Sequence, residues 1–284
     1  MKSMKLSTSS TRIYKPVLVL VMLCAAGASS IEEVVRGVSM TDEGLYFSSS
    51  YRSSFPNFGN LEVEEANNFV PGVGTVMKMS MQGSVTVDTD NEKSFTTYRS
   101  SFYDNDYFGF SGSIGYRIGD IRMEFESFHN EFNVRGAAGS MHEDDPAYIA
   151  LVRGKAISKT NYVLVKNEKI GVSSITFNVC CDIRSKHDPI VSYVCMGISG
   201  NVIDILDTSE VTHGYYGKMG VGIAVTDDAL LFIGGYYHAM HRDTFDNIKL
   251  IVPSANGMDP RPTFASAKIS TAYLGGEIGV RYMF

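Results

Sequence analysis

The chain has 284 residues, of which 25 are lysine or arginine and 31 are aspartate or glutamate, so its formal net charge is −6. This length fits one large domain or two small ones. The acidic balance argues against a nucleic-acid partner, because such binding needs lysine and arginine gathered on one face.

The first 28 residues predict a secretory signal peptide. Four basic residues precede the first acidic one, Glu32, and lead into the apolar run VLVLVMLCAAGA at 17–28, which ends in small residues. This run is shorter than the roughly 20 apolar residues of a spanning helix, and its flanks are typical of a leader. We therefore expect residues 29–284 to leave the cytoplasm as the mature protein; the alternative is a buried N-terminal helix.

Alternation with a period of two predicts strands, most clearly around the two-residue turn Gly119-Asp120. Before the turn, YFGFSGSIGYRI at 107–118 places apolar side chains on one face and glycine, serine and arginine on the other. After it, IRMEFES at 121–127 continues both faces, which predicts a β-hairpin. Eight strands are predicted in this way, near 43–52, 107–118, 121–132, 172–183, 189–199, 213–225, 229–241 and 268–284.

The connections between these strands alternate between long and short. The short ones are turns, and the long ones, expected to be surface loops, are 53–106, 133–171, 200–212 and 242–267. Outer-membrane barrels combine an even strand number with short periplasmic turns and longer extracellular loops. No second long apolar run follows the leader, so a chain in the membrane must cross it as strands. We therefore predict an all-β fold, an antiparallel transmembrane β-barrel of eight strands.

Two smaller elements are predicted within the long connections. Asp144 to Pro146, followed by AYIALVRGKA, predicts the start of a helix, because proline is favoured in the first helical turn. The alternating residues at 73–87 predict a hairpin.

If the apolar faces point to lipid, the charged residues of the strands point into the barrel. An eight-stranded barrel is nearly filled by side chains, so charges of both signs are expected to pair there. One interpretation is a structural plug of salt bridges, and the other is a polar path for small solutes, with inward glycines such as Gly115 and Gly220 leaving room for water. The predicted lumen charge network consists of Arg117, Arg122, Glu124, Glu126, Lys218, Glu277 and Arg281.

The last strand, STAYLGGEIGVRYMF, is predicted to close the barrel against the first strand near Leu45. Its apolar positions are expected to face lipid, and Glu277 and Arg281 to face the lumen. A terminal aromatic residue commonly serves as the assembly signal of such barrels, so Phe284 is predicted to contact the barrel assembly machinery.

Cysteine and histidine patterns predict neither a cofactor nor a metal site. After the leader the cysteines are Cys180, Cys181 and Cys195, and Cys195 could pair with either of the other two. No Cys or His spacing is typical of zinc.

A catalytic site is not predicted either. His238, His241 and Asp243 lie near the outer end of one strand, but the two histidine rings should point to opposite faces of that strand. No hydrolase or phosphate-binding motif accompanies them. A barrel enzyme acting on lipid or peptide remains an alternative hypothesis.

Several stretches resemble the major surface antigen family of Anaplasma, Ehrlichia and related rickettsiales. They are GFSGSIGYRIGDIRMEFESFHNEFNV (109–134), LVKNEKIGVSSITFNVCCDI (164–183), PIVSYVCMGISGNVIDILD (189–207), GYYGKMGVGI (214–223), GYYHAM (235–240) and AYLGGEIGVRYMF (272–284). The blocks occur in the family's order over most of the mature chain. The resemblance implies an outer-membrane barrel with immunodominant surface loops, porin activity in some members, and no catalytic motif.

The function expected from these observations is that of a bacterial outer-membrane surface antigen with host-facing loops, which could also act as a porin for small solutes. Its expected partners are outer-membrane lipid, the barrel assembly machinery, host surface molecules and antibodies. A soluble secreted ligand-binding barrel would show the same alternation, but with its aromatic side chains pointing inward.

Overall fold

The computed structural model describes residues 43–66, 77–81, 89–135, 147–184, 190–241 and 244–284. The predicted signal peptide lies outside these residues. None of the helical segments in the described part of the chain has the length and apolar character needed to span a membrane.

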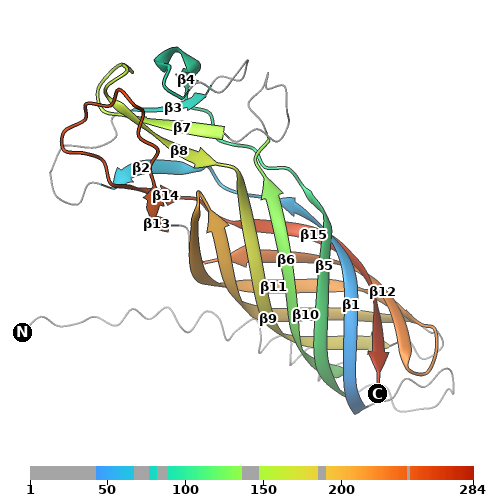
Figure 1. The fold of residues 1–284 in the computed structure, drawn as a ribbon. Coiled ribbons are helices and arrows are strands. Elements are labelled where there is room, and N and C mark those ends of the chain that lie inside the picture. Colours follow the sequence, from blue (N-terminus) through green and yellow to red (C-terminus); the bar gives the residue numbers. More distant parts are fainter. Residues whose placement is uncertain (1–42, 67–76, 82–88, 136–146, 185–189, 242–243) are drawn as a thin grey trace, which may run out of the picture.

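Eight antiparallel strands close into a barrel, which confirms the predicted fold (Figure 1). The order around the wall is β1-β15-β12-β11-β10-β9-β6-β5. These strands are β1 (Glu43–Pro56), β5 (Asp106–Ile118), β6 (Ile121–Asn133), β9 (Lys169–Arg184), β10 (Ile190–Ile205), β11 (Thr208–Ala224), β12 (Ala229–Met240) and β15 (Ala272–Met283). The first and last strands close the barrel as expected: Phe47 lies opposite Tyr282, and the Phe284 amide donates a hydrogen bond of 2.9 Å to the Leu45 carbonyl.

The two faces of each barrel strand lie in opposite environments. On β5, Phe108 is 81% exposed and Phe110 and Ile114 are also exposed, whereas Ser113 and Arg117 are buried inside. The other barrel strands repeat this arrangement, with apolar side chains outward and polar ones inward. A transmembrane barrel requires this orientation, whereas a soluble barrel would place the apolar side chains in its core.

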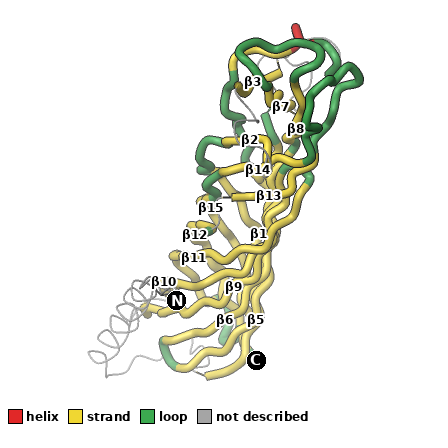
Figure 2. Tube along the Cα trace, turned by 90° about the vertical axis from the view of Figure 1, so that its left-hand side faces the viewer, coloured by secondary structure: helices red, strands yellow, loops and turns green. Residues whose placement is uncertain are grey.

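The long connections do not form separate loops; they combine into a second β-structured region beyond one end of the barrel, here called the head (Figure 2). The head contains two sheets, of order β13-β14-β2 and β4-β3-β7-β8. Its strands are β2 (Glu62–Ala66), β3 (Met77–Met81), β4 (Phe95–Thr97), β7 (Ala147–Val152), β8 (Tyr162–Asn167), β13 (Thr244–Lys249) and β14 (Phe264–Lys268), with a 3₁₀ turn η2 (Glu92–Ser94) before β4.

Strands from different connections pair with one another in the head. From the first connection, β2 pairs with β14 of the last, and β3 pairs with β7 of the second. Leu164 of β8 also forms a bridge with Ile251, after β13. The head is therefore one unit, in which strands from different connections are paired with one another. The C-terminus lies at the opposite end of the barrel (Figure 1).

The predicted loop 200–212 is wrong. Here β10 and β11 continue to a two-residue turn at Leu206 and Asp207, whose φ angles are 52° and 58°. Positive φ at both central residues is the geometry that suits the twist of a hairpin. The hairpin extends because Ile203 and Ile205 remain inward and join the core shared with the head.

The predicted helix after Pro146 is also wrong, because the apolar run is strand β7. Ile149 and Leu151 pack into the core shared with the barrel, while Ala150 and Val152 pack with Phe95 on the other side of the sheet. A strand buried on both faces loses the alternation that marks a strand in sequence.

The expected hairpin at 73–87 is replaced, where the chain is described, by β3, whose neighbours are β4 and β7. The rest of that stretch lies outside the described residues. The remaining long connections, 53–106, 133–171 and 242–267, contribute the strands of the head in place of simple loops.

Candidate functional site

The candidate site is the interior of the barrel, where the predicted charged residues gather. The structure places every one of them inside, and none is more than 7% exposed. They come from strands all around the wall, namely Arg117 on β5, Arg122, Glu124 and Glu126 on β6, Lys218 on β11, and Glu277 and Arg281 on β15.

Ion pairs link five of these residues into a connected network, which begins near the short turns. Arg117 Nη2 lies 3.4 Å from Asp182 Oδ2, and Arg122 Nε lies 2.9 Å from Asp182 Oδ1. Arg122 Nη1 then reaches Glu124 Oε2 at 3.2 Å. The Tyr46 hydroxyl donates to the same Glu124 oxygen at 2.7 Å.

The ion-pair network continues across the lumen through Lys218. Lys218 Nζ lies 2.5 Å from Glu124 Oε1 and 2.9 Å from Glu126 Oε2, so one ammonium bridges two carboxylates. Arg52 Nη1 pairs with Glu126 Oε1 at 3.1 Å. The Arg52 guanidinium lies 4.0 Å from the centre of the Phe128 ring and 3.8 Å from that of Tyr236, which is cation–π geometry.

Glu277 and Arg281 join the interior through aromatic neighbours. The Tyr193 hydroxyl donates a hydrogen bond of 3.0 Å to Glu277 Oε1. The Arg281 guanidinium lies 5.3 Å from the Tyr46 ring centre and 5.5 Å from that of Phe232. Ion pairs and contacts with aromatic rings therefore both hold the charged side chains of the lumen in place.

Aromatic rings occupy the space next to the inward glycines. The Tyr46 ring lies against Gly115, and the Tyr193 hydroxyl lies where a side chain on Gly220 would stand. A large side chain on one strand therefore depends on the absence of one on its neighbour. This corrects the expectation that these glycines leave room for a water path.

Two charged residues of this ion-pair network, Arg52 and Asp182, were not among those predicted from the sequence. Both lie on polar faces of alternating strands, beside the serines of β1 and the asparagine and threonine of β9, so their inward direction was readable. Their partners were not, because Arg52 and Glu126 are 74 positions apart.

His238 lies inside the barrel in a hydrogen-bonded group. Its Nε2 is 2.8 Å from Ser199 Oγ, and its Nδ1 is 2.8 Å from the Tyr273 hydroxyl. A hydroxyl, a histidine and an orienting group in this order are the components of an activated nucleophile. The Ser199 side chain is almost fully buried and His238 completely so, which closes this group to a lipid or peptide substrate.

The other members of the predicted histidine cluster are not part of this group. His241 is exposed and stacks on His213 with ring centres 4.8 Å apart. His238 and His241 therefore point to opposite faces, as expected, and Asp243 lies outside the described residues.

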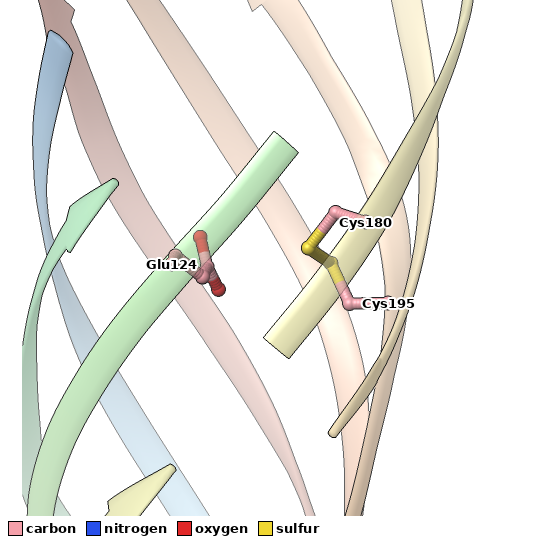
Figure 3. Close-up of side chains that lie close together, drawn as sticks. All are labelled: Glu124, Cys180 and Cys195. Atoms are coloured by element: carbon pink, nitrogen blue, oxygen red, sulfur yellow. A yellow bond between two sulfur atoms is a disulfide. The ribbon is translucent and has the colours of Figure 1, made fainter. Parts of the chain in front are cut away.

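Cys195 pairs with Cys180, which decides between the two predicted alternatives, and joins β9 to β10. Figure 3 shows Glu124 on β6 beside this disulfide. The carboxylate and the two sulfur atoms lie within 4.8 Å of one another. Metal binding by cysteine requires thiolate sulfur, so this group cannot act as a metal site while the disulfide is formed.

The chain is similar to known surface and outer-membrane proteins. A family model described as surface antigen matches residues 38–284. Major surface antigen 4 of Anaplasma marginale is 26% identical over 253 residues, which are 89% of this chain and 88% of that protein. The outer membrane protein OprG of Pseudomonas aeruginosa has a TM-score of 0.52 at 12% identity, covering 88% of this chain and 99% of OprG.

Sequence and structure point to the same assignment. The family model covers nearly all of the chain that follows the predicted leader, and the likeness to OprG supports the barrel fold. The exposed apolar wall of the barrel fits a membrane. The chain therefore belongs to the surface antigen family and is an eight-stranded outer-membrane β-barrel.

Proposed function

We propose that this protein presents its head to the host as a surface antigen, and that the barrel is a closed anchor for it. The observation that carries this proposal is the continuity of the two cores. Leu61 and Ile149 of the head belong to the same buried cluster as Phe132 and Tyr273 of the barrel. A head seated in this way holds a fixed shape above the membrane, which suits recognition by host surface molecules and antibodies.

The packed lumen supports the anchor role. The charged residues of the interior are paired or covered by aromatic rings, and the space beside its glycines is filled. Buried charges that are paired and hydrogen-bonded are costly to move apart. We infer that the interior stabilises the barrel and does not conduct solutes freely.

The same proposal includes two contacts of the barrel itself. Its outer wall contacts outer-membrane lipid, and Phe284, 75% exposed beside Tyr282, is the residue that the assembly machinery would recognise. We assign no catalytic role to the protein, since Ser199 and His238 lie out of reach of a substrate.

We expect an epitope tag inserted after Lys155, in the turn between β7 and β8, to be detected by antibody on intact cells. The matched control carries the same tag between Gly119 and Asp120, at the opposite end of the barrel, and should be detected only after the outer membrane is opened. Equal staining of both tags on intact cells would contradict the proposed orientation, provided that both variants are assembled into the membrane.

A porin function is the second candidate, and some interior atoms favour it. Arg52 Nε and Nη2 and Glu277 Oε2 are buried and have no hydrogen-bond partner among the residues that the structure describes. Buried polar atoms of this kind are commonly satisfied by water, and a connected line of water could pass small ions.

The two candidates differ in conductance. We expect the purified protein, reconstituted in planar lipid bilayers, to show no discrete conductance steps, because the charge network and the head close the lumen. Reproducible single-channel steps that disappear when the protein is heat-denatured before reconstitution would establish the porin in place of the closed anchor.

A further inference from the structure

A depression of about 560 Å³ lies on the outer wall of the barrel, across β6, β9, β10 and β11. This volume is within the range of about 300–1,000 Å³ that is typical of ligand pockets. Its outward-facing lining residues are Ser127, His129, Ser173, Ile175, Gly200, Val202 and Val211.

Small residues make the wall hollow at this place. Ser127, Ser173 and Gly200 stand on three neighbouring strands. On the side away from the head, the next outward residue of each strand is larger and apolar, namely Phe125, Ile175 and Ile198. A side-chain carbon added to Gly200 would have no atom of a described residue within 4 Å. Ile175 and Val211, 62% and 73% exposed, line the same hollow. The depression is therefore open, and its exposed walls are mainly apolar.

The depression lies at the head-side edge of the apolar wall. Farther from the head on the same strands, Phe125 and Phe177 are exposed, with ring centres 5.0 Å apart. Toward the head, the outer face becomes polar: His129 Nδ1 lies 2.9 Å from Ser173 Oγ, and Lys169 Nζ lies 2.6 Å from Glu131 Oε2. The change from apolar to charged side chains marks the boundary between acyl chains and head groups.

We propose that this depression binds one acyl chain of an outer-leaflet membrane lipid, whose polar end lies beside His129 and Ser173. The hollow is continuous with the wall that lipid already covers, so an acyl chain reaches it without leaving the membrane. The apolar walls match the chain, and the polar edge matches the region where a lipid head group begins. This inference depends on the membrane location of the barrel and is independent of the head's proposed role.

The experiment uses the full-length protein in vesicles of phosphatidylethanolamine and phosphatidylglycerol that contain a trace of phospholipid with a photoreactive acyl chain. After illumination, the labelled residues are mapped by peptide mass spectrometry. We expect labelling to concentrate on 127–129, 173–175 and 200–211. On the opposite part of the wall, the outward residues of β1 and β15 should be labelled only weakly.

Two glycine variants make the test specific. Gly200→Phe fills the depression and should lose most of the labelling there. Gly276→Phe is the matched control, because Gly276 also faces outward, on β15 at the opposite side of the barrel, and a side-chain carbon there would lie no closer than 3.6 Å to a described protein atom. This control should keep the wild-type labelling map.

Two results would overturn the proposal. One is even labelling around the whole outer wall of the wild-type protein, and the other is concentrated labelling that Gly200→Phe leaves unchanged. The difference in gel mobility between unheated and heated samples checks that each variant is folded. The wild-type map decides the question even if Gly200→Phe does not assemble.

Discussion

Replacing Glu124 with alanine is expected to lower the free energy of unfolding of the barrel by about 3–5 kcal/mol, the usual cost of breaking a buried ion pair from one side. Glu124 accepts hydrogen bonds from Tyr46, Arg122, Asn178 and Lys218. Alanine removes one negative charge from among buried cations and leaves the phenol and the amide with one acceptor fewer. Urea unfolding of the protein refolded in detergent micelles measures the change.

The matched control is Glu131→Ala, on the same strand. Glu131 pairs with Lys169, but both side chains are substantially exposed, so the loss is expected to be about 0–1 kcal/mol. Similar unfolding midpoints for the two variants would mean that the interior charges contribute little to stability. In that case the interpretation of the lumen as a structural plug would fail, and the porin hypothesis would gain support.

The charged interior could be predicted from sequence because successive side chains of a strand point to opposite faces of the sheet. Arg117 alternates with Tyr116 and Ile118, and once the barrel is assumed, its side chain must point inward. This alternation does not say which inward residue meets which across the lumen. Asp182 illustrates this limit: its contact with Arg122 joins β9 to β6 and depends on the register of strands that are distant in sequence.

The head could not be predicted, since its strands find partners in other connections. β2 pairs with β14, about two hundred positions away in sequence, and β14 is its only strand partner among the described residues. β14 also pairs with β13 of its own connection, but a long segment separates these two strands in place of a tight turn. Short strands without a local hairpin leave no turn signal. The run at β7 adds a second obstacle, because burial on both faces removes its period of two.

Replacing Arg153 with alanine is expected to loosen the head while the barrel stays assembled. Arg153, at the end of β7, forms an ion pair with Glu65 of β2, and its Nε donates to Glu65 Oε2 at 2.9 Å. Its Nη1 donates to the Pro260 carbonyl at 2.6 Å. One side chain therefore links residues of three connections, namely Arg153 itself, Glu65 and Pro260. Glu65 lies in one sheet of the head, and Arg153 follows a strand of the other. Hydrogen bonds to charged groups contribute about 1.5–3 kcal/mol each, so their loss is large for a region of short strands.

The measurement is limited proteolysis of the protein in lipid vesicles, with binding of conformation-dependent antibodies as a second readout. We expect Arg153→Ala to be cut in the head at lower protease concentration and to bind such antibodies more weakly, with an unchanged heat-dependent gel shift of the barrel. Arg135→Ala is the matched control, because the ion pair of Arg135 with Asp104 is more open to solvent, with side chains 64% and 36% exposed. If the two variants resist protease equally, the Arg153 tie does not hold the head together. If instead the barrel of Arg153→Ala also fails to assemble, the head and barrel fold as one cooperative unit, which their shared core would explain.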